Sequence, residues 1–461
     1  MRKILLVVIV LMITTAEKSM LYGQSGIAYR CATFQIDTSS YYLLEGNHHC
    51  WRNEYLVACN RESFNQCRFT LMNVRPAPGL AANVYFRLPV DIDVRDFQIV
   101  GDMVFFCGTY NNQGSGIGWF DINELYTTTS AQVTVHGQSI PLGSDMKQLN
   151  KMIAYQDNNV VHLVVAGSNE NYRNVDYNLR IVDCEFANNQ IVNPQQWICP
   201  SAIGLQEYYN ELNVVGDYLV LTGIYLDLSM PLANGYCFRR YKLGGIANGQ
   251  IDTCFYLNIQ ENVTFAPRTE TVTPQMLALI SYSELGDFRP LRLLGITVPS
   301  MCVAFSQVTT PPEKVRPTDL VYCPQADSLV VSIVHPYALS SGYYGELFLM
   351  SPHPVPLPYY SCAIESQHTE YVSFMLMLQG RYLTTLQQTT LFVRDLTVPL
   401  MAYSTCYIPR TRLIKPDNIC NPIRKYSPQD LKTPDIGATI SRGYVTNIGS
   451  SNVVCFDGNS Y

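Results

Sequence analysis

The chain has 461 residues and a formal net charge of −6, and only 15% of its residues are charged while 47% are hydrophobic. It contains no lysine- or arginine-rich run, so the composition excludes the basic surface that nucleic-acid-binding proteins use. The length suits either two to four ordinary domains or one large repeat domain.

The first residues predict export. Arg2 and Lys3 precede an uninterrupted apolar run over 4–13. That run is shorter than the roughly 20 residues a membrane-spanning helix needs. We therefore predict a signal peptide over 1–23, cleaved after Ala16 or Gly23, and one domain over 24–461; an uncleaved anchor is the alternative. The expected location is the periplasm, the cell surface or the extracellular space, with no transmembrane segment after cleavage.

Hairpin-like segments then recur along the chain, beginning near residues 53, 101, 158, 216, 275, 325, 379 and 441. Their spacing of roughly 40 to 70 residues is typical of repeat architectures. The second unit has expected strands over 94–100, 103–109, 116–122 and 132–136, and the fourth over 211–215, 218–225, 235–243 and 250–258. Four-stranded antiparallel sheets repeated around an axis form a β-propeller. We predict an all-β fold with a single β-propeller of eight four-stranded blades, with seven as the alternative.

The two ends of the chain predict how the ring closes. The last unit, over 436–456, has three expected strands, and the stretch 27–36 is one strand without a unit of its own. Pairing the N-terminal strand with the C-terminal blade completes an eighth sheet. A closed ring also removes the exposed sheet edges of an open stack.

One segment carries a family resemblance. The stretch 443–457 reads Gly-Tyr-Val-Thr-Asn-Ile-Gly-Ser-Ser-Asn-Val-Val-Cys-Phe-Asp. It resembles the blade repeat of the YVTN-type β-propellers of bacterial surface proteins, in which a Tyr-Val-Thr-Asn strand turns through Ser-Asn into a second strand. The resemblance covers one unit, implies the propeller fold and a structural role for Tyr444 to Asn447, and implies no ligand.

Fifteen cysteines without a Cys-x-x-Cys pair favour disulfides in an oxidising compartment over a metal or redox motif. Matching third- and fourth-strand positions predict three bridges: Cys184 with Cys199, Cys237 with Cys254, and Cys31 with Cys455 across the ring closure. Cys406 and Cys420 are expected to pin the irregular loop over 410–435, and Cys302 and Cys323 are candidates to link two blades. Cys50, Cys59, Cys67, Cys107 and Cys362 have no assigned partner, and buried free thiols are the alternative for several of these cysteines.

Catalytic and metal motifs are scarce. His48, His49 and Cys50 are adjacent, and neighbouring residues of a strand point to opposite faces, so a metal site is not expected there. Asp91, Asp93 and Asp96 suit calcium by chemistry but fit a solvated turn better. Neither Gly-x-Ser-x-Gly nor His-Glu-x-x-His occurs. We predict no metal, no cofactor and no catalytic residue.

Loop lengths point to a binding face. The turns between first and second strands are tight, whereas the loops between second and third strands are long in several units and emerge on one face of a propeller. The candidate binding residues there are Asn111, Asn112, Asn169, Tyr172, Arg173, Asp227, Asp287, Arg289, Tyr337, Tyr343 and Tyr344. Tyrosine, asparagine and arginine combine aromatic area with hydrogen bonding. The expected function is non-catalytic binding or scaffolding of a secreted protein or a glycan; the alternatives are a glycosidase or lyase that uses channel carboxylates, or a purely structural envelope component.

Overall fold

The computed structural model describes strands and short turns between residues 29 and 456. The described segments are 29–35, 49–52, 55–63, 66–73, 84–88, 92–110, 114–124, 132–140, 148–157, 159–168, 178–200, 205–227, 234–243, 251–258, 267–282, 291–310, 316–324, 327–335, 344–350, 352, 360–364, 374–379, 382–387, 390–395, 410–413, 429–430, 435–444 and 452–456.

The strands pair in groups of four that follow the chain order. The first two groups are β2 (His49–Arg52), β3 (Tyr55–Ser63), β4 (Gln66–Asn73) and β5 (Val84–Arg87), then β6 (Ile92–Val100), β7 (Met103–Tyr110), β8 (Gly114–Asp121) and β9 (Gln132–Ile140). The third and fourth groups are β10 (Gln148–Asp157), β11 (Val160–Ser168), β12 (Asn178–Ala187) and β13 (Gln190–Pro200), then β14 (Leu205–Val215), β15 (Tyr218–Asp227), β16 (Asn234–Lys242) and β17 (Ile251–Asn258). Consecutive strands within each group run antiparallel, as the sequence predicts.

The next groups continue this order. They are β18 (Arg268–Thr273), β19 (Met276–Tyr282), β20 (Leu291–Thr297) and β21 (Cys302–Thr310), then β22 (Arg316–Cys323), β23 (Ser328–His335), β24 (Tyr344–Met350) and β25 (Tyr360–Ile364). The last group joins β26 (Phe374–Gln379), β27 (Tyr382–Gln387) and β28 (Thr390–Asp395) to the N-terminal β1 (Tyr29–Gln35). Its outer strand therefore comes from the opposite end of the chain.

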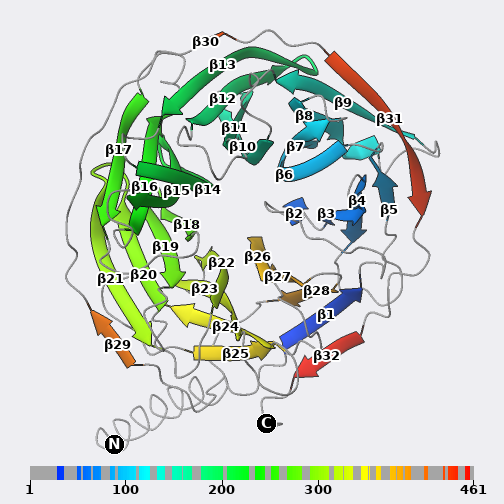
Figure 1. The fold of residues 1–461 in the computed structure, drawn as a ribbon. Coiled ribbons are helices and arrows are strands. Elements are labelled where there is room, and N and C mark those ends of the chain that lie inside the picture. The colour runs from blue at the N-terminus through cyan, green and yellow to red at the C-terminus, as the bar shows by residue number, and fades with distance from the viewer. Residues whose placement is uncertain are drawn as a thin grey trace, which may run out of the picture.

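The groups lie around a common centre (Figure 1). The first strand of each group is nearest that centre, and these inner strands contact one another in succession from β2 through β6, β10, β14, β18 and β22 to β26, which contacts β2. The chain therefore has an all-β, propeller-like architecture built from four-stranded antiparallel sheets.

Four C-terminal strands lie on the outer side of this arrangement (Figure 1). They are β29 (Arg410–Leu413) on β21, β30 (Gln429–Asp430) on β13, β31 (Asp435–Tyr444) between β9 and β5, and β32 (Asn452–Phe456) on β1. The pairing of the N-terminal strand with the last strand is as predicted. The segment 436–456 does not form a sheet of its own, because β31 and β32 pair with different sheets and not with each other. The predicted YVTN-like hairpin is therefore absent from these strand pairings.

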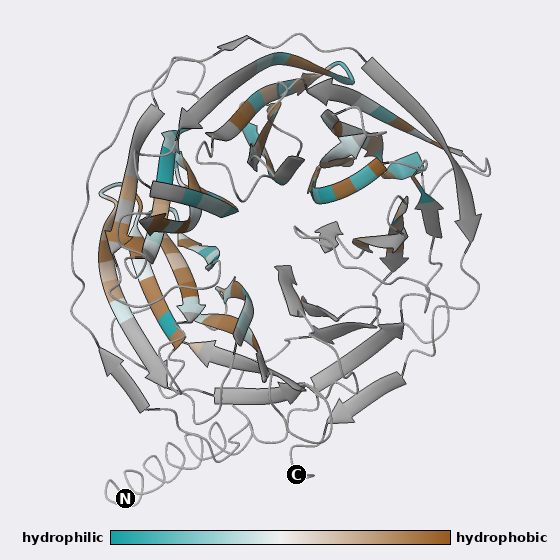
Figure 2. Ribbon diagram, viewed as in Figure 1, coloured by the Kyte–Doolittle hydropathy of each residue, from teal (hydrophilic) through white to brown (hydrophobic). Residues whose placement is uncertain are grey.

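Apolar side chains fill the spaces between neighbouring sheets. One cluster joins Phe105, Trp119 and Ile117 to Leu163 and Val182 of the next sheet. Comparable clusters join the sheets of β14 and β18, and of β18 and β22. Figure 2 shows apolar residues along β19 and β20, which lie in the middle of their sheet. Strands that are apolar on both faces are the consequence of being covered on both sides.

Candidate functional site

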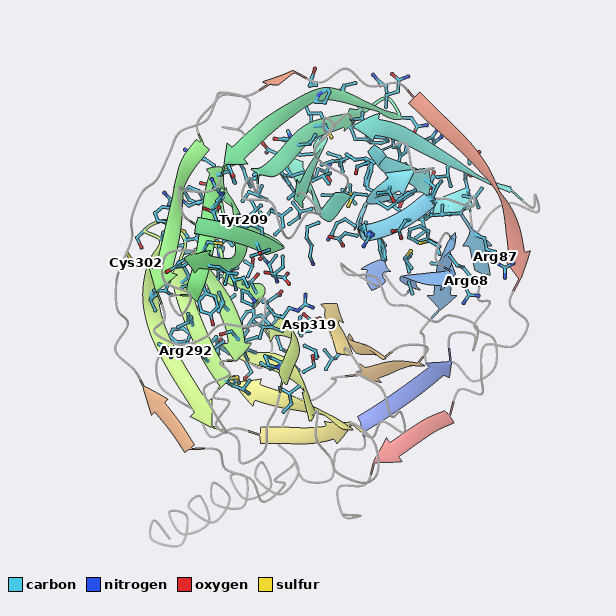
Figure 3. All side chains as sticks on the ribbon, in the orientation of Figure 1. Arg68, Arg87, Tyr209, Arg292, Cys302 and Asp319 are labelled. Atoms are coloured by element: carbon cyan, nitrogen blue, oxygen red, sulfur yellow. The ribbon has the colours of Figure 1, made fainter. Side chains whose placement is uncertain are left out.

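Five charged side chains on inner strands form the central charge cluster. They are Lys151 of β10, Glu211 of β14, Arg268 and Glu270 of β18, and Asp319 of β22. Glu211 links three strands: its Oε1 accepts from Arg268 Nη1 at 2.8 Å, and its Oε2 lies 3.8 Å from Lys151 Nζ. Figure 3 shows Asp319 close to the centre of the ring and Arg87 at its outer side.

Polar bonds continue along the junction of β14 with β18. Asn210 Nδ2 donates to the Pro267 carbonyl at 2.6 Å, and Thr269 Oγ1 donates to Asn213 Oδ1 at 2.6 Å. Thr271 Oγ1 donates to the Val214 carbonyl at 2.9 Å. Neighbouring sheets are thus joined by hydrogen bonds at the centre and by apolar packing farther out.

Glu270 is the unusual member of the cluster. Burial, the negative charge of Asp319 and, more weakly, that of Glu211 raise its pKa to about 8, although a hydrogen bond with the Tyr322 backbone acts in the opposite direction. A carboxyl group that still holds its proton near neutral pH can donate a hydrogen bond or a proton. This arrangement could bind a polar ligand or serve as a general acid.

A second polar group supports the base of a long loop. Arg239 Nη2 donates to Glu207 Oε2 at 2.7 Å, and both side chains are almost fully buried, with 3% and 2% exposed. Tyr209 Oη donates to the same oxygen at 2.8 Å and accepts from Arg239 Nε at 2.8 Å. Glu207 and Tyr209 lie near the start of β14, which pairs with the end of β15, and Arg239 lies on β16. Strands β15 and β16 flank residues 228–233.

A side-chain hydrogen bond joins this sheet to the next one, at the ends of β16 and β19. Tyr236 Oη, at the start of β16, is hydrogen-bonded to Ser281 Oγ, near the end of β19. The bond therefore joins the start of β16, which follows residues 228–233, to the end of β19, which precedes residues 283–290.

The structure describes two of the eleven predicted binding residues. Asp227 ends β15 and Tyr344 begins β24, so both flank long loops as expected. The other nine, Asn111, Asn112, Asn169, Tyr172, Arg173, Asp287, Arg289, Tyr337 and Tyr343, lie outside the described residues. The central charge cluster and the Glu207–Arg239–Tyr209 group were not predicted, because their members are far apart in the sequence.

The tight turns lie on the opposite edge. Gly216, with a φ of 58°, could not carry a Cβ without colliding with the Pro274 carbonyl of the next tight turn. Asn189, in the turn between β12 and β13, accepts a bond from Trp119 Nε1 at 2.9 Å and lies 3.3 Å from His136 Nε2. Arg240 Nη1 similarly reaches the Val298 carbonyl at 2.7 Å. Side chains on this edge thus form hydrogen bonds between neighbouring sheets.

Asn189 gives a matched pair of substitutions, because its φ of 58° is left-handed. Asn189→Gly removes the bonds to Trp119 and His136 and keeps the backbone unstrained, at an expected cost of about 1 kcal/mol. Asn189→Ala removes the same bonds and leaves in the left-handed region an alanine, which tolerates this conformation less well than asparagine or glycine and costs about 1–2 kcal/mol more. Urea unfolding should therefore rank wild type above Asn189→Gly and Asn189→Ala last. Equal stability of the two variants would contradict this account of the turn.

A titratable group lies between the sheets of β10 and β14. The Tyr155 and His162 rings stack with centroids 5.0 Å apart, and His162 Nδ1 is 4.0 Å from Asp183 Oδ1. Burial, with a contribution from the charge of Glu185, raises the pKa of Asp183 to about 7. This group contains the second carboxyl that holds a proton near neutral pH.

Two of the three aspartates predicted to lie in a solvated turn, Asp93 and Asp96, belong instead to strand β6. Asp96 is 1% exposed, and its oxygens accept from the backbone N–H groups of Phe97 and Met152, both at 2.9 Å. Asp93 pairs with Arg95 at 3.0 Å, and Asp91 lies outside the described residues. Asp96 therefore joins β6 to β10, because a buried carboxylate is stable where N–H donors satisfy it.

The predicted disulfides do not fit the strand registers. Cys199 is opposite Leu179, five residues from Cys184, which places the two cysteines roughly 16 Å apart along the strands. Cys254 is opposite Arg239, two residues from Cys237, a diagonal of about 7–8 Å. Bridged Cα atoms lie within about 7 Å. The thiol of Cys184 is free and donates to the Leu163 carbonyl at 3.5 Å, and Cys302 is also free.

The ring-closing pair is one position out of register. Arg30 is opposite Cys455, and Cys31 is opposite Val454. A bridge between Cys31 and Cys455 would require a shift of one residue, so peptide mapping under non-reducing conditions remains its test. Cys406 and Cys420 lie outside the described residues.

Two further findings apply to the described segments. They contain no group of three or more histidine, cysteine or carboxylate side chains placed to hold a metal ion. They also contain no helix with the length and apolar character needed to cross a membrane. The predicted signal peptide over 1–23 lies outside these segments.

Neither a known protein-family model nor a curated protein matches the chain. Among solved structures, polysaccharide lyase Uly1 is similar with a TM-score of 0.48 at 10% identity, over 80% of this chain and 98% of that one. Trypanosoma rangeli sialidase gives 0.34 at 10% identity, over 66% and 54% of the two chains. The extracellular domains of Drosophila Semaphorin 1a give 0.31 at 10% identity, over 80% and 88%. Because these TM-scores are below 0.5, the fold description rests on the chain's own strand pairing.

Proposed function

We propose that this chain is an exported binding protein whose long-loop edge recognises another secreted protein or a glycan. The observation that carries the proposal is the difference in length between two kinds of connection: first and second strands are joined by tight turns, and second and third strands are joined by long loops in four of the groups. First and second strands are joined by two-residue turns at 101–102, 158–159, 216–217 and 274–275. In four groups the second and third strands are joined by the longer loops 169–177, 228–233, 283–290 and 336–343. In the other three groups this connection spans only 64–65, 111–113 and 388–389.

The scaffold beneath these loops supports a binding role. The buried Glu207–Arg239 pair and the Tyr236–Ser281 bond hold the strands from which two of the loops emerge. Long loops on a fixed scaffold are where binding residues concentrate.

We further propose a closed propeller with seven blades, in place of the preferred eight, because the inner strands contact in series and β26 returns to β2.

The binding proposal is tested on the loop side chains. Alanine substitution at Tyr172, Arg173, Tyr343 and Tyr344 should weaken binding to a glycan array or to captured secreted proteins by tenfold or more. Truncation of an aromatic or arginine side chain at the centre of an interface costs roughly 2 kcal/mol or more of binding free energy. The melting temperature should stay close to that of wild type.

The opposite edge offers matched controls. Asp217→Ala and Gln275→Ala change exposed residues of the tight turns and should leave binding unchanged. Loss of binding in these controls, with retention in the loop variants, would place the functional face on the tight-turn edge.

The second candidate is an enzyme acting on a polysaccharide, and one observation favours it. Glu270 retains its proton near neutral pH beside Asp319 and Glu211, as a general acid does. New reducing ends or unsaturated sugars in digests of a bound glycan, lost in Glu270→Gln while binding persists, would establish catalysis. Binding without turnover would leave the first candidate.

A further inference from the structure

Two neighbouring junctions at the ring centre are built differently. Strands β14 and β18 are joined by the Arg268–Glu211 ion pair and by hydrogen bonds from Asn210, Thr269 and Thr271. These contacts join opposite charges, or a donor to an acceptor, and they stabilise the junction.

The junction of β18 with β22 has the opposite character at its polar end. Its apolar part joins Val272 and Ile280 to Leu320 and Leu329. Thr269 and Thr271 of β18 bond to β14, so the alternation of side chains along a strand places Glu270 on the face toward β22, together with Val272 of this cluster. There Glu270 is hydrogen-bonded to the Tyr322 backbone, and the charge of Asp319 acts on it. Two carboxylates repel when both are ionised, and the partly buried position strengthens that repulsion.

The net charge of the cluster depends on whether Glu270 is protonated. Lys151 and Arg268 contribute two positive charges, and Glu211 and Asp319 contribute two negative charges. The sum is zero when Glu270 carries a proton and −1 when it does not. Asp319 of β22 and Glu211 of β14 act on Glu270 through their charges, and the Tyr322 backbone of β22 acts through a hydrogen bond. The two cations of the cluster lie beside Glu211: Arg268 of β18 at 2.8 Å and Lys151 of β10 at 3.8 Å. Strand β19 contains no charged residue.

We propose that the proton of Glu270 is a switch that controls how firmly the inner strands β18 and β22 pack at the ring centre. With the proton in place the cluster is neutral and the junction is closed. Release of the proton adds an unbalanced carboxylate opposite Asp319 and loosens the junction, while the β14–β18 junction keeps its ion pair. The switch acts in the unliganded chain and is independent of the binding proposal.

The raised pKa of Glu270, about 8, sets the range in which the switch operates. The junction is therefore closed at slightly acid and neutral pH and loosened under mildly alkaline conditions. Local opening of this kind is seen as a loss of amide-exchange protection without global unfolding.

Hydrogen exchange measured by mass spectrometry on the full chain tests this switch. After correction for intrinsic exchange rates, peptides covering β18 and β22 of the wild type should lose ~tenfold protection between about pH 6 and about pH 9.5. Peptides covering β14 should change much less. Glu270→Gln, which keeps the shape and cannot ionise, should retain the protection of β18 and β22 at both pH values.

Two further variants make the test specific. Asp319→Asn removes the charge that helps to raise the pKa of Glu270, so the midpoint of the change should move to lower pH. Asp183→Asn removes the other carboxyl with a raised pKa and should leave the response of β18 and β22 as in wild type. The proposal would be overturned if Glu270→Gln lost as much protection at high pH as the wild type does. If Glu270→Gln does not fold, an unchanged midpoint in Asp319→Asn would overturn it instead.

Discussion

Replacing Glu207 with leucine is expected to lower the free energy of unfolding by about 3–5 kcal/mol, because it leaves the guanidinium of Arg239 buried without its carboxylate. The Arg239 side chain is only 3% exposed, so water cannot replace the lost partner. Tyr209, which bonds to both side chains, loses its bond to Glu207 and keeps its bond to Arg239. Urea unfolding followed by circular dichroism measures the change.

The double variant Glu207→Leu with Arg239→Met separates loss of the pair from loss of one partner. Replacement of a buried ion pair by apolar side chains is often neutral or stabilising, so the double variant should recover most of the lost stability. Asp217→Asn, on an exposed tight turn, is the surface control and should stay within about 0.5 kcal/mol of wild type. If Glu207→Leu matches this control, the pair does not stabilise the fold.

The sequence predicts the repeating strands well because their signals are local. The turn at Gly101 and Asp102 separates two runs of β-forming residues, and β6 and β7 begin and end within two residues of their predicted bounds. Around Gly216, whose positive φ suits glycine, the two strands meet the turn at the predicted residues 215 and 218. Strand β14 nevertheless begins at Leu205, well before its predicted start at 211. Alternation and turn chemistry act over a few residues, so they can be read without knowledge of the rest of the fold.

Long-range partners account for the predictions that were wrong. Asp96 is buried because the backbone N–H of Met152 satisfies it from another sheet. The segment around Tyr444 is locally suited to a hairpin, yet β31 pairs with β5 and β9, and β32 pairs with β1. Disulfide register likewise depends on β-bulges, such as the irregularity beside Cys184, that periodicity does not show.

The central charge cluster also depends on contacts between residues that are far apart in the sequence. Glu270 and Asp319 belong to the first strands of successive groups, and the residues between them complete three further strands. The charged residues in those strands were visible in the sequence, but nothing in their spacing shows that the inner strands converge. A search for charged residues at the same position of successive first strands is the signal that could have found them.

The pH dependence of stability is the second large effect that we expect, and Asp183 provides it. Its pKa rises from 3.8 unfolded to about 7 in the native state, because the side chain is buried beside Glu185. Between those values the native state binds more protons than the unfolded state, so stability is fully present below about pH 4 and declines as the pH rises to about 7. A shift of this size corresponds to at most about 4 kcal/mol, and less because the side chain is 15% exposed.

Asp183→Asn removes this titration, so its free energy of unfolding should fall less steeply between about pH 4 and about pH 8 than that of the wild type. The curves should lie closest at the acid end, where Asp183 is protonated and resembles asparagine in charge. Glu270 contributes a decline of the same sign that continues to about pH 8, so the double variant with Glu270→Gln should be flatter still. A variant that is less stable than wild type by the same amount at every pH would show that Asp183 contributes packing and not proton binding, because a packing defect carries no pH dependence.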